Sequence, residues 1–117
     1  MTYSDGKTTI APEVLLTIAR LTTGNVPGVS RLSPVPSATL QRLIKRGHAT
    51  DGVTIEIQDG IVYADLFVIL NNDVNVRDVS RKLQREVSRA ISEMVGMQVG
   101  RVNVHIEDID YPQEGEA

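Results

Sequence analysis

The chain has 117 residues, of which 41% are hydrophobic, 23% are charged and only 3% are aromatic. This length and apolar content predict a single domain with an aliphatic core. The absence of cysteine excludes disulfides, thiolate zinc sites and cysteine nucleophiles. The N-terminus has no apolar run after its positive charge, and no stretch of about 18 apolar residues occurs, so we expect no signal peptide and no integral membrane segment.

Charge is unevenly distributed along the chain, although the net charge is only −3. Residues 30–50 contain four basic residues and no acidic one, whereas residues 107–117 contain five acidic residues and no basic one. We predict a flexible lead-in over residues 1–8 and a single domain over residues 9–110. Within that domain, residues 33–50 form a variable basic linker or short helix. Residues 111–117 follow the domain as a solvated acidic tail.

The first elements are a helix, a short strand and a second, shorter helix. Pro12 suits a first helical turn and Gly24 suits a helix end, so a helix is predicted between them. Its predicted apolar face consists of Val14, Ile18, Leu21 and Thr22, with Leu15 at the edge. A short strand is predicted over Val29–Leu32. Ser37 is predicted to cap a helix over Ala38–Arg46, whose buried side holds Leu40, Leu43 and Ile44.

A β-hairpin gives the clearest local pattern. Val53–Gln58 alternates strictly between apolar and polar residues, and Asp59–Gly60 suits a type I′ turn. The return strand, Ile61–Leu70, is apolar on both faces. We expect its first face to pack on helices, and this face consists of Val62, Ala64, Leu66 and Val68. Its second face, with Tyr63, Phe67 and Ile69, needs another cover.

A long helix and a final strand complete the predicted domain. The helix covers Val76–Met94, with Asn75 as N-cap and Gly96 as left-handed C-cap. Its predicted apolar face holds Val76, Val79, Leu83, Val87, Ala90, Ile91 and Met94. The final strand, Val99–Ile109, runs parallel to the return strand through a right-handed crossover. The predicted fold is therefore α/β (α+β), a two-layer sandwich in which two main helices cover one face of a small mixed β-sheet.

Several runs of residues resemble one known family. These runs are Ile10-Ala11-Pro12-Glu13-Val14, Asn25-Val26-Pro27-Gly28-Val29, Met94-Val95-Gly96-Met97 and Val102-Asn103-Val104-His105-Ile106. Together they resemble the alkaline shock protein family of bacterial envelope stress response proteins. The resemblance covers residues 9–109 and implies a cytoplasmic, self-associating protein without known catalytic residues. It also implies, for some members, a position at the inner membrane face through a separate anchor protein.

The chain departs from the family pattern at two places. Asn71-Asn72-Asp73 stands where many relatives have an aromatic–glycine pair, and residues 38–46 are more helical and basic than expected. Both departures concern the partner and not the fold.

None of the candidate motifs predicts catalysis or a cofactor. Gly6-Lys7-Thr8 lacks the preceding glycine and strand of a phosphate-binding loop. Asn71–Asn75 lacks the glycine and the glutamate of a calcium loop, so we interpret it as a turn that leads into a helix cap. His105 and His48 are too few for a zinc site, and we interpret His105 as a surface or interface residue. We therefore predict no catalytic residue, no metal and no cofactor.

Two surfaces are candidates for partner binding. Tyr63, Phe67 and Ile69 are predicted to form an exposed interface for a homo-oligomer, unless residues 33–46 cover them with Leu40, Leu43 and Ile44. Basic residues could alternatively contact an anionic partner, and these are Arg42, Lys45, Arg46, Arg77, Arg81, Arg85 and Arg89. The last four form an arginine stripe on the long helix, where the pairs Asp78–Lys82, Lys82–Glu86 and Arg89–Glu93 favour an ion-paired, solvated surface.

The predicted function follows from the lack of a predicted catalytic site and from the two candidate surfaces. We favour a non-enzymatic protein-interaction module that self-associates and acts at the inner membrane face through a membrane-anchored protein partner. The alternative is a nucleic-acid-binding domain that uses residues 31–48 and the arginine stripe. A pI of about 5.3 and the scarcity of aromatic residues argue against it.

Overall fold

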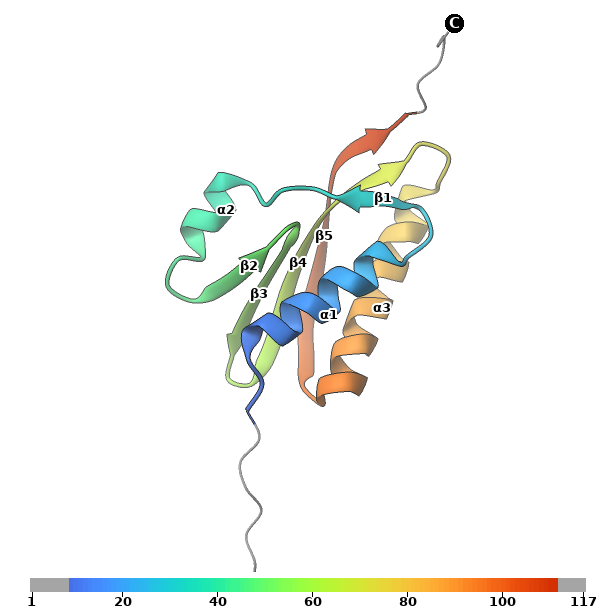
Figure 1. Cartoon of the computed structure of the whole chain (residues 1–117). Helices are drawn as coiled ribbons and strands as arrows, with labels where there is room; N and C mark the ends of the chain where they lie inside the picture. The colour runs from blue at the N-terminus through green and yellow to red at the C-terminus, as the bar shows by residue number, and fades with distance from the viewer. Residues whose placement is uncertain (1–8, 112–117) are drawn as a thin grey trace, which may run out of the picture.

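The computed structural model describes residues 9–111, which form two layers of helices and strands (Figure 1). In chain order the elements are α1 (Pro12–Gly24), β1 (Val29–Leu32), α2 (Ser37–Arg42), β2 (Gly47–Thr50), β3 (Val53–Gln58), β4 (Ile61–Asn71), α3 (Val76–Val95) and β5 (Gln98–Asp110). The expected lead-in, the Gly6-Lys7-Thr8 motif and all but the first residue of the expected acidic tail lie outside the described residues.

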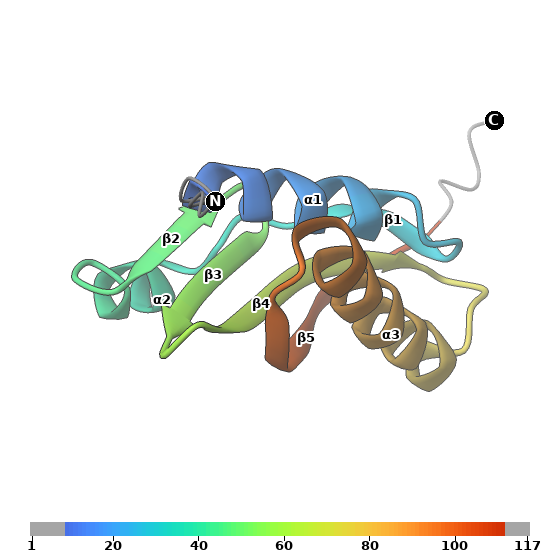
Figure 2. The same cartoon turned by 90° about the horizontal axis from the view of Figure 1, so that it is seen from below.

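The sheet is mixed and is organised around β4. β5 runs parallel along the whole of β4, whereas β3 and β1 pair antiparallel with its first and last parts, and β2 pairs antiparallel with β3. Since a strand has two edges, β3 and β1 share the edge of β4 that β5 does not use. Helices α1 and α3 cover the same face of this sheet (Figures 1 and 2). The predicted two-layer arrangement of two main helices on a mixed sheet is therefore confirmed.

The hairpin and the core face of β4 also follow the prediction. Asp59 and Gly60 have φ values of 52° and 77°, as a type I′ turn requires. The apolar residues of β3 and β4 that point toward the helices are buried, and these are Val53, Ile55, Val62, Ala64, Leu66, Val68 and Leu70. The core is thus aliphatic, as the composition predicts.

Helix α3 is held by the predicted caps and by one apolar stripe. The Asn75 side chain accepts a hydrogen bond from the Asp78 backbone N–H at 3.0 Å, and Gly96 adopts a left-handed conformation with φ of 74°. The buried residues are Val79, Leu83, Val87 and Ile91, each of which stabilises the fold by about 1.5–3 kcal/mol. Val76 and Met94 are exposed, so the predicted apolar face is wrong at its two ends.

The predicted apolar face of α1 is rotated relative to the observed one. The helix buries Leu15, Leu16, Ala19 and Thr23, whereas Val14 and Leu21 are 45% and 53% exposed. The helix carries two adjacent apolar stripes, and its contact with the sheet uses the one that includes small residues. Small side chains allow a closer approach of the helix to the sheet. In the second stripe Val14 and Leu21 face solvent, whereas Ile18 is half-buried and packs against the core.

Residues 33–50 differ most from the prediction. The short helix ends at Arg42, its N-cap is Pro36 rather than Ser37, and Gly47–Thr50 forms the edge strand β2. Leu43 is buried, and its side chain occupies the space that a Cβ on Gly47 would need. Leu40 and Ile44 are exposed. The predicted lid of three leucine and isoleucine side chains over the second sheet face is therefore wrong, because α2 lies beyond β2 at one end of the sheet (Figures 1 and 2).

Candidate functional site

The face of the sheet opposite α1 and α3 carries a cluster of polar and aromatic side chains. Strand register places Asp65 of β4 between Thr54 of β3 and Asn103 of β5, and places Tyr63 beside Arg101 and Phe67 beside His105. We call these seven residues the sheet-face cluster: Thr54, Tyr63, Asp65, Phe67, Arg101, Asn103 and His105. No helix among residues 9–111 packs across this cluster (Figure 2).

The Asp65 carboxylate is the hydrogen-bonding centre of the cluster. Thr54 Oγ1 donates to Asp65 Oδ2 at 3.3 Å. Asn103 Nδ2 donates to Asp65 Oδ1 at 3.1 Å, and His105 Nε2 lies 2.9 Å from the same oxygen. Asp65 and His105 keep 23% and 42% of their side-chain surface exposed. One carboxylate therefore cross-links three strands at a partly hydrated surface.

Two ring contacts extend the cluster along β4 and β5. The Phe67 and His105 rings are stacked, with centroids 4.5 Å apart and planes inclined by 9°. The Arg101 guanidinium lies 5.1 Å from the centroid of the Tyr63 ring, within the range of a cation–π contact. The histidine ring is therefore fixed on one side by Asp65 and on one face by Phe67.

The three apolar residues predicted as an exposed patch are mostly covered. Phe67 and Ile69 are only 3% and 8% exposed, and Tyr63 is half-buried. The His105 ring covers Phe67, whose backbone also pairs with Ser33 and Gly52 at 2.8 Å. The expected exposure of Phe67 and Ile69 is thus wrong, and for Phe67 the stacked His105 ring of β5 supplies part of the cover. Their role as an interface stays a prediction.

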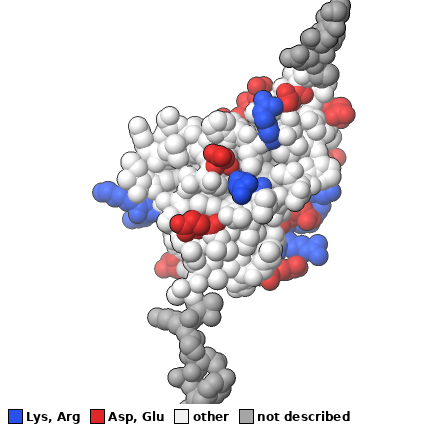
Figure 3. Space-filling view, in the orientation of Figure 1, with Lys and Arg blue, Asp and Glu red and all other residues white. Residues whose placement is uncertain are grey.

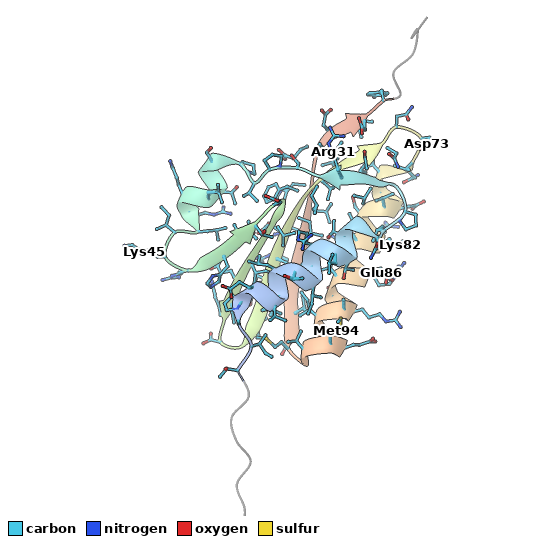
Figure 4. All side chains as sticks on the ribbon, in the orientation of Figure 1. Arg31, Lys45, Asp73, Lys82, Glu86 and Met94 are labelled. Carbon is cyan, nitrogen blue, oxygen red and sulfur yellow. The ribbon has the colours of Figure 1, made fainter. Side chains whose placement is uncertain are left out.

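The basic residues fall into two separated groups. Arg42, Lys45 and Arg46 lie at α2 and the turn after it, whereas Arg77, Arg81, Arg85 and Arg89 lie on α3, and these elements are on opposite sides of the molecule (Figures 1 and 4). Charges of both signs are interspersed on the helix-covered face (Figure 3). The structure therefore does not bring the two groups into one anionic-partner site.

Ion pairing along α3 follows the prediction in part. Of the three predicted pairs, Arg89–Glu93 forms at 3.1 Å. Within residues 9–111 the pairs Asp78–Lys82 and Lys82–Glu86 do not form, whereas Arg85 contacts Glu86 at 3.7 Å. The exposure of these side chains makes each pair worth about 0–1 kcal/mol.

The remaining polar motifs do not assemble a second site. The Asn71–Asn75 turn ends in the predicted helix cap at Asn75. His48 is on the edge strand β2, and register places it beside Ile55 of β3 and away from His105. Among residues 9–111 no three histidine or carboxylate side chains are placed to hold a metal ion.

An ion pair fixes the end of β5 to β1. Ser30 Oγ donates to Asp110 Oδ2 at 2.5 Å, and Arg31 Nη1 donates to the same oxygen at 2.7 Å. The hydrogen bond from Ser30 and the positive charge of Arg31 lower the pKa of the Asp110 carboxyl from its ordinary value. This contact joins the two strands that flank the last part of β4.

The site and fold define a class of small α/β proteins that hold a polar hydrogen-bonded cluster on an open sheet face. Residues 1–111 match the model of the alkaline shock protein 23 family, which is described as having a cell envelope-related function. The chain therefore belongs to this family, as the sequence resemblance predicts. Within residues 9–111 no helix is both long enough and apolar enough to cross a membrane.

Curated relatives are similar over most of their length. The Bacillus subtilis protein YqhY is 25% identical over 107 residues, which cover 91% of this chain and 78% of the relative. The Streptococcus pyogenes protein Spy1535 is 31% identical over 105 residues, which cover 89% of this chain and 79% of the relative. Among solved structures, a copper form of the MamM CTD aligns with a TM-score of 0.49 and 11% identity, covering 90% of each chain.

Proposed function

We propose that this chain is a non-enzymatic protein-interaction module that self-associates and acts at the inner face of the cell membrane through a partner protein. Membership of a family with a cell envelope-related function supports the cellular setting. The proposal assigns the open sheet face to the partner protein, with the half-buried Tyr63 as the accessible member of the predicted interface of Tyr63, Phe67 and Ile69.

The observation that carries this proposal is the hydrogen bonding of Asp65. Both of its carboxylate oxygens are engaged by side chains of the cluster itself. A general base needs a lone pair directed at a substrate proton, and a nucleophile needs a base directed at it. Within the described residues His105 is paired with Asp65, and no hydroxyl is hydrogen-bonded to its ring as a nucleophile would be. This fixed and partly exposed set of side chains suits recognition of a partner surface.

Arg101 is the part of the cluster best suited to a protein partner. Its side chain is exposed and lies over the Tyr63 ring, and aromatic residues and arginine are enriched in protein interfaces. An acidic group on the partner can pair with the guanidinium while an apolar group contacts the ring.

The test is affinity capture of the full chain from its own cells, scored for protein, lipid and RNA in the same experiment. We expect a protein partner that is retained by the wild-type chain and lost with Arg101→Glu, because this substitution reverses the charge at the centre of the proposed contact. Arg81→Glu is the matched control, since it makes the same change on α3. Tight, sequence-selective RNA binding at physiological salt, or capture that is insensitive to Arg101→Glu, would contradict the proposal.

A further inference from the structure

The helix layer has an exposed apolar region beside a groove. The groove has a volume of about 440 Å³ and lies between the end of α1 with its following loop and the second half of α3. Its walls include Thr22, Val26 and Pro27 on one side and Ala90 and Met94 on the other. Met94 is 71% exposed and lies near the end of α3 (Figure 4).

Exposed apolar side chains of α1 lie on the same helix layer as this groove. Leu21 precedes the groove-lining Thr22 in sequence, and Val14 lies two turns before Leu21 on the same side of the helix. Val14, Leu21 and Met94 are three of the large apolar residues that the described part of the chain leaves exposed. Exposed apolar side chains that gather beside a groove mark interaction surfaces in soluble proteins.

The charges along the α3 wall of the groove identify the occupant. Lys82, Glu86, Arg89 and Glu93 all line the groove, and their signs alternate as positive, negative, positive, negative. These residues are spaced by four, three and four positions, so the spacing is the same from either end of the helix. The order of positive and negative charges, in contrast, is reversed when the helix is followed from its other end. An identical helix that runs antiparallel therefore places Glu93 opposite Lys82 and Arg89 opposite Glu86.

We propose that a second copy of this chain docks on the helix layer, with the two α3 helices antiparallel about a two-fold axis near residues 87 and 88. Each α3 lies along the groove of the other copy. Because of the two-fold symmetry, the Lys82–Glu93 pair and the Glu86–Arg89 pair each occur twice in the dimer. Such an isologous contact uses the same surface on both copies and closes as a dimer. The inference rests on the self-association in the proposed function and assigns it to a surface distinct from the sheet face.

The existing ion pair on α3 is compatible with this contact. Arg89 and Glu93 pair within the helix at 3.1 Å, but both side chains are about two-thirds exposed. An exposed pair of this kind is weak, so its members can also contact charges of a second copy. The dimer then adds a second partner for each group without breaking the helix.

The test is sedimentation of the full chain and of charge-reversal variants. We expect the wild type to form a dimer and Lys82→Glu to raise the dimer dissociation constant by about tenfold or more, because it places like charges opposite each other twice per dimer. Adding Glu93→Lys to that variant restores opposite charges and should recover dimerisation. Arg81→Glu is the matched control on the same helix, and Met94→Glu tests the apolar part of the contact.

The possible results separate this inference from the proposed function. A wild-type dimer that is unaffected by Lys82→Glu and Met94→Glu would overturn the helix-layer dimer and leave self-association intact. Loss of the dimer in Lys82→Glu without recovery in the double variant would overturn the antiparallel register. If the wild type stays monomeric at high concentration, or binds only another protein through this surface, the helix-layer dimer is wrong. The self-association in the proposed function is then wrong as well. Circular dichroism confirms that each variant is folded.

Discussion

The two faces of β4 are built from the same strand but are stabilised in different ways. On the helix side Val62, Leu66 and Val68 are completely buried, and the contacts are apolar and non-directional. On the other side Asp65 joins three strands through side-chain hydrogen bonds, and its carboxylate remains partly exposed. The first face fixes the fold, whereas the second fixes the orientation of a small number of polar groups. Substitutions on the two faces should therefore differ in kind as well as in size.

The largest expected effect comes from the core face. Leu66→Ala removes a side chain that is 0% exposed and leaves a cavity between the sheet and the helices. We expect the free energy of unfolding to fall by about 2–5 kcal/mol, with a matching loss of thermal stability. Urea denaturation followed by circular dichroism measures this change. Leu40→Ala is the matched control on an exposed residue of α2, and an equal loss in the two variants would contradict the assignment of Leu66 to the core.

A smaller effect is expected from the open face. Asp65→Ala removes the acceptor for Thr54, Asn103 and His105. Water can reach Asn103 and His105, which are partly exposed, whereas Thr54 is buried and loses its side-chain partner. We expect a loss of about 1–3 kcal/mol in the free energy of unfolding. NMR of the His105 ring should show that its orientation is no longer fixed. An unchanged His105 environment would show that the Asp65 contact does not position the ring.

The difference between the faces also explains what could be predicted from the sequence. The core face of β4 and the buried stripe of α3 follow from hydrophobic periodicity, and the turn at Asp59–Gly60 and the caps of α3 follow from local backbone chemistry. These signals are local, so they require no knowledge of which strands are neighbours. They predict the elements of the fold, and the parallel pairing of β4 and β5 was predicted separately, from the right-handed crossover through the long helix.

The sheet-face cluster depends instead on register between distant strands. Asp65 and Asn103 meet because β4 and β5 pair with one specific offset, which includes irregularities after Val62 and Val68. Given the predicted crossover, the outward positions of Asn103 and His105 were known, but the offset that places them beside Asp65 was not. The outward-facing Asp65 in an otherwise apolar strand is the one signal that could have suggested a polar cluster at this position.

Two local predictions were wrong because contacts with the sheet, and not the local sequence pattern, decide the structure there. In α1 the stripe with Val14 and Leu21 and the stripe with Leu15 and Ala19 are both helical, and only packing against the sheet selects between them. In β2 the sequence Gly47-His48-Ala49-Thr50 lacks an apolar alternation, so its pairing with β3 decides its structure. The exposed α1 stripe then became visible as a candidate surface only after the packing was known.

The smallest expected effect concerns the contact between Asp110 and the β1 residues Ser30 and Arg31, at the margin of the open face. Because the pKa of Asp110 is lowered in the folded chain, folding is stabilised when the carboxyl is ionised. This contribution is fully present above the ordinary pKa of 3.8 and is lost as the pH falls through the lower, folded value. The wild type should therefore be more stable than Asp110→Asn at pH 7, and the difference should shrink below about pH 4. Denaturation of both proteins across this pH range measures this difference in stability, with Asp59→Asn as a control at a turn that has no such ion pair.

The Arg31–Asp110 pair is exposed, so added salt should also reduce the difference in stability at pH 7. A difference that is constant from pH 7 to pH 3 would show that the ionised Asp110 does not stabilise the end of β5.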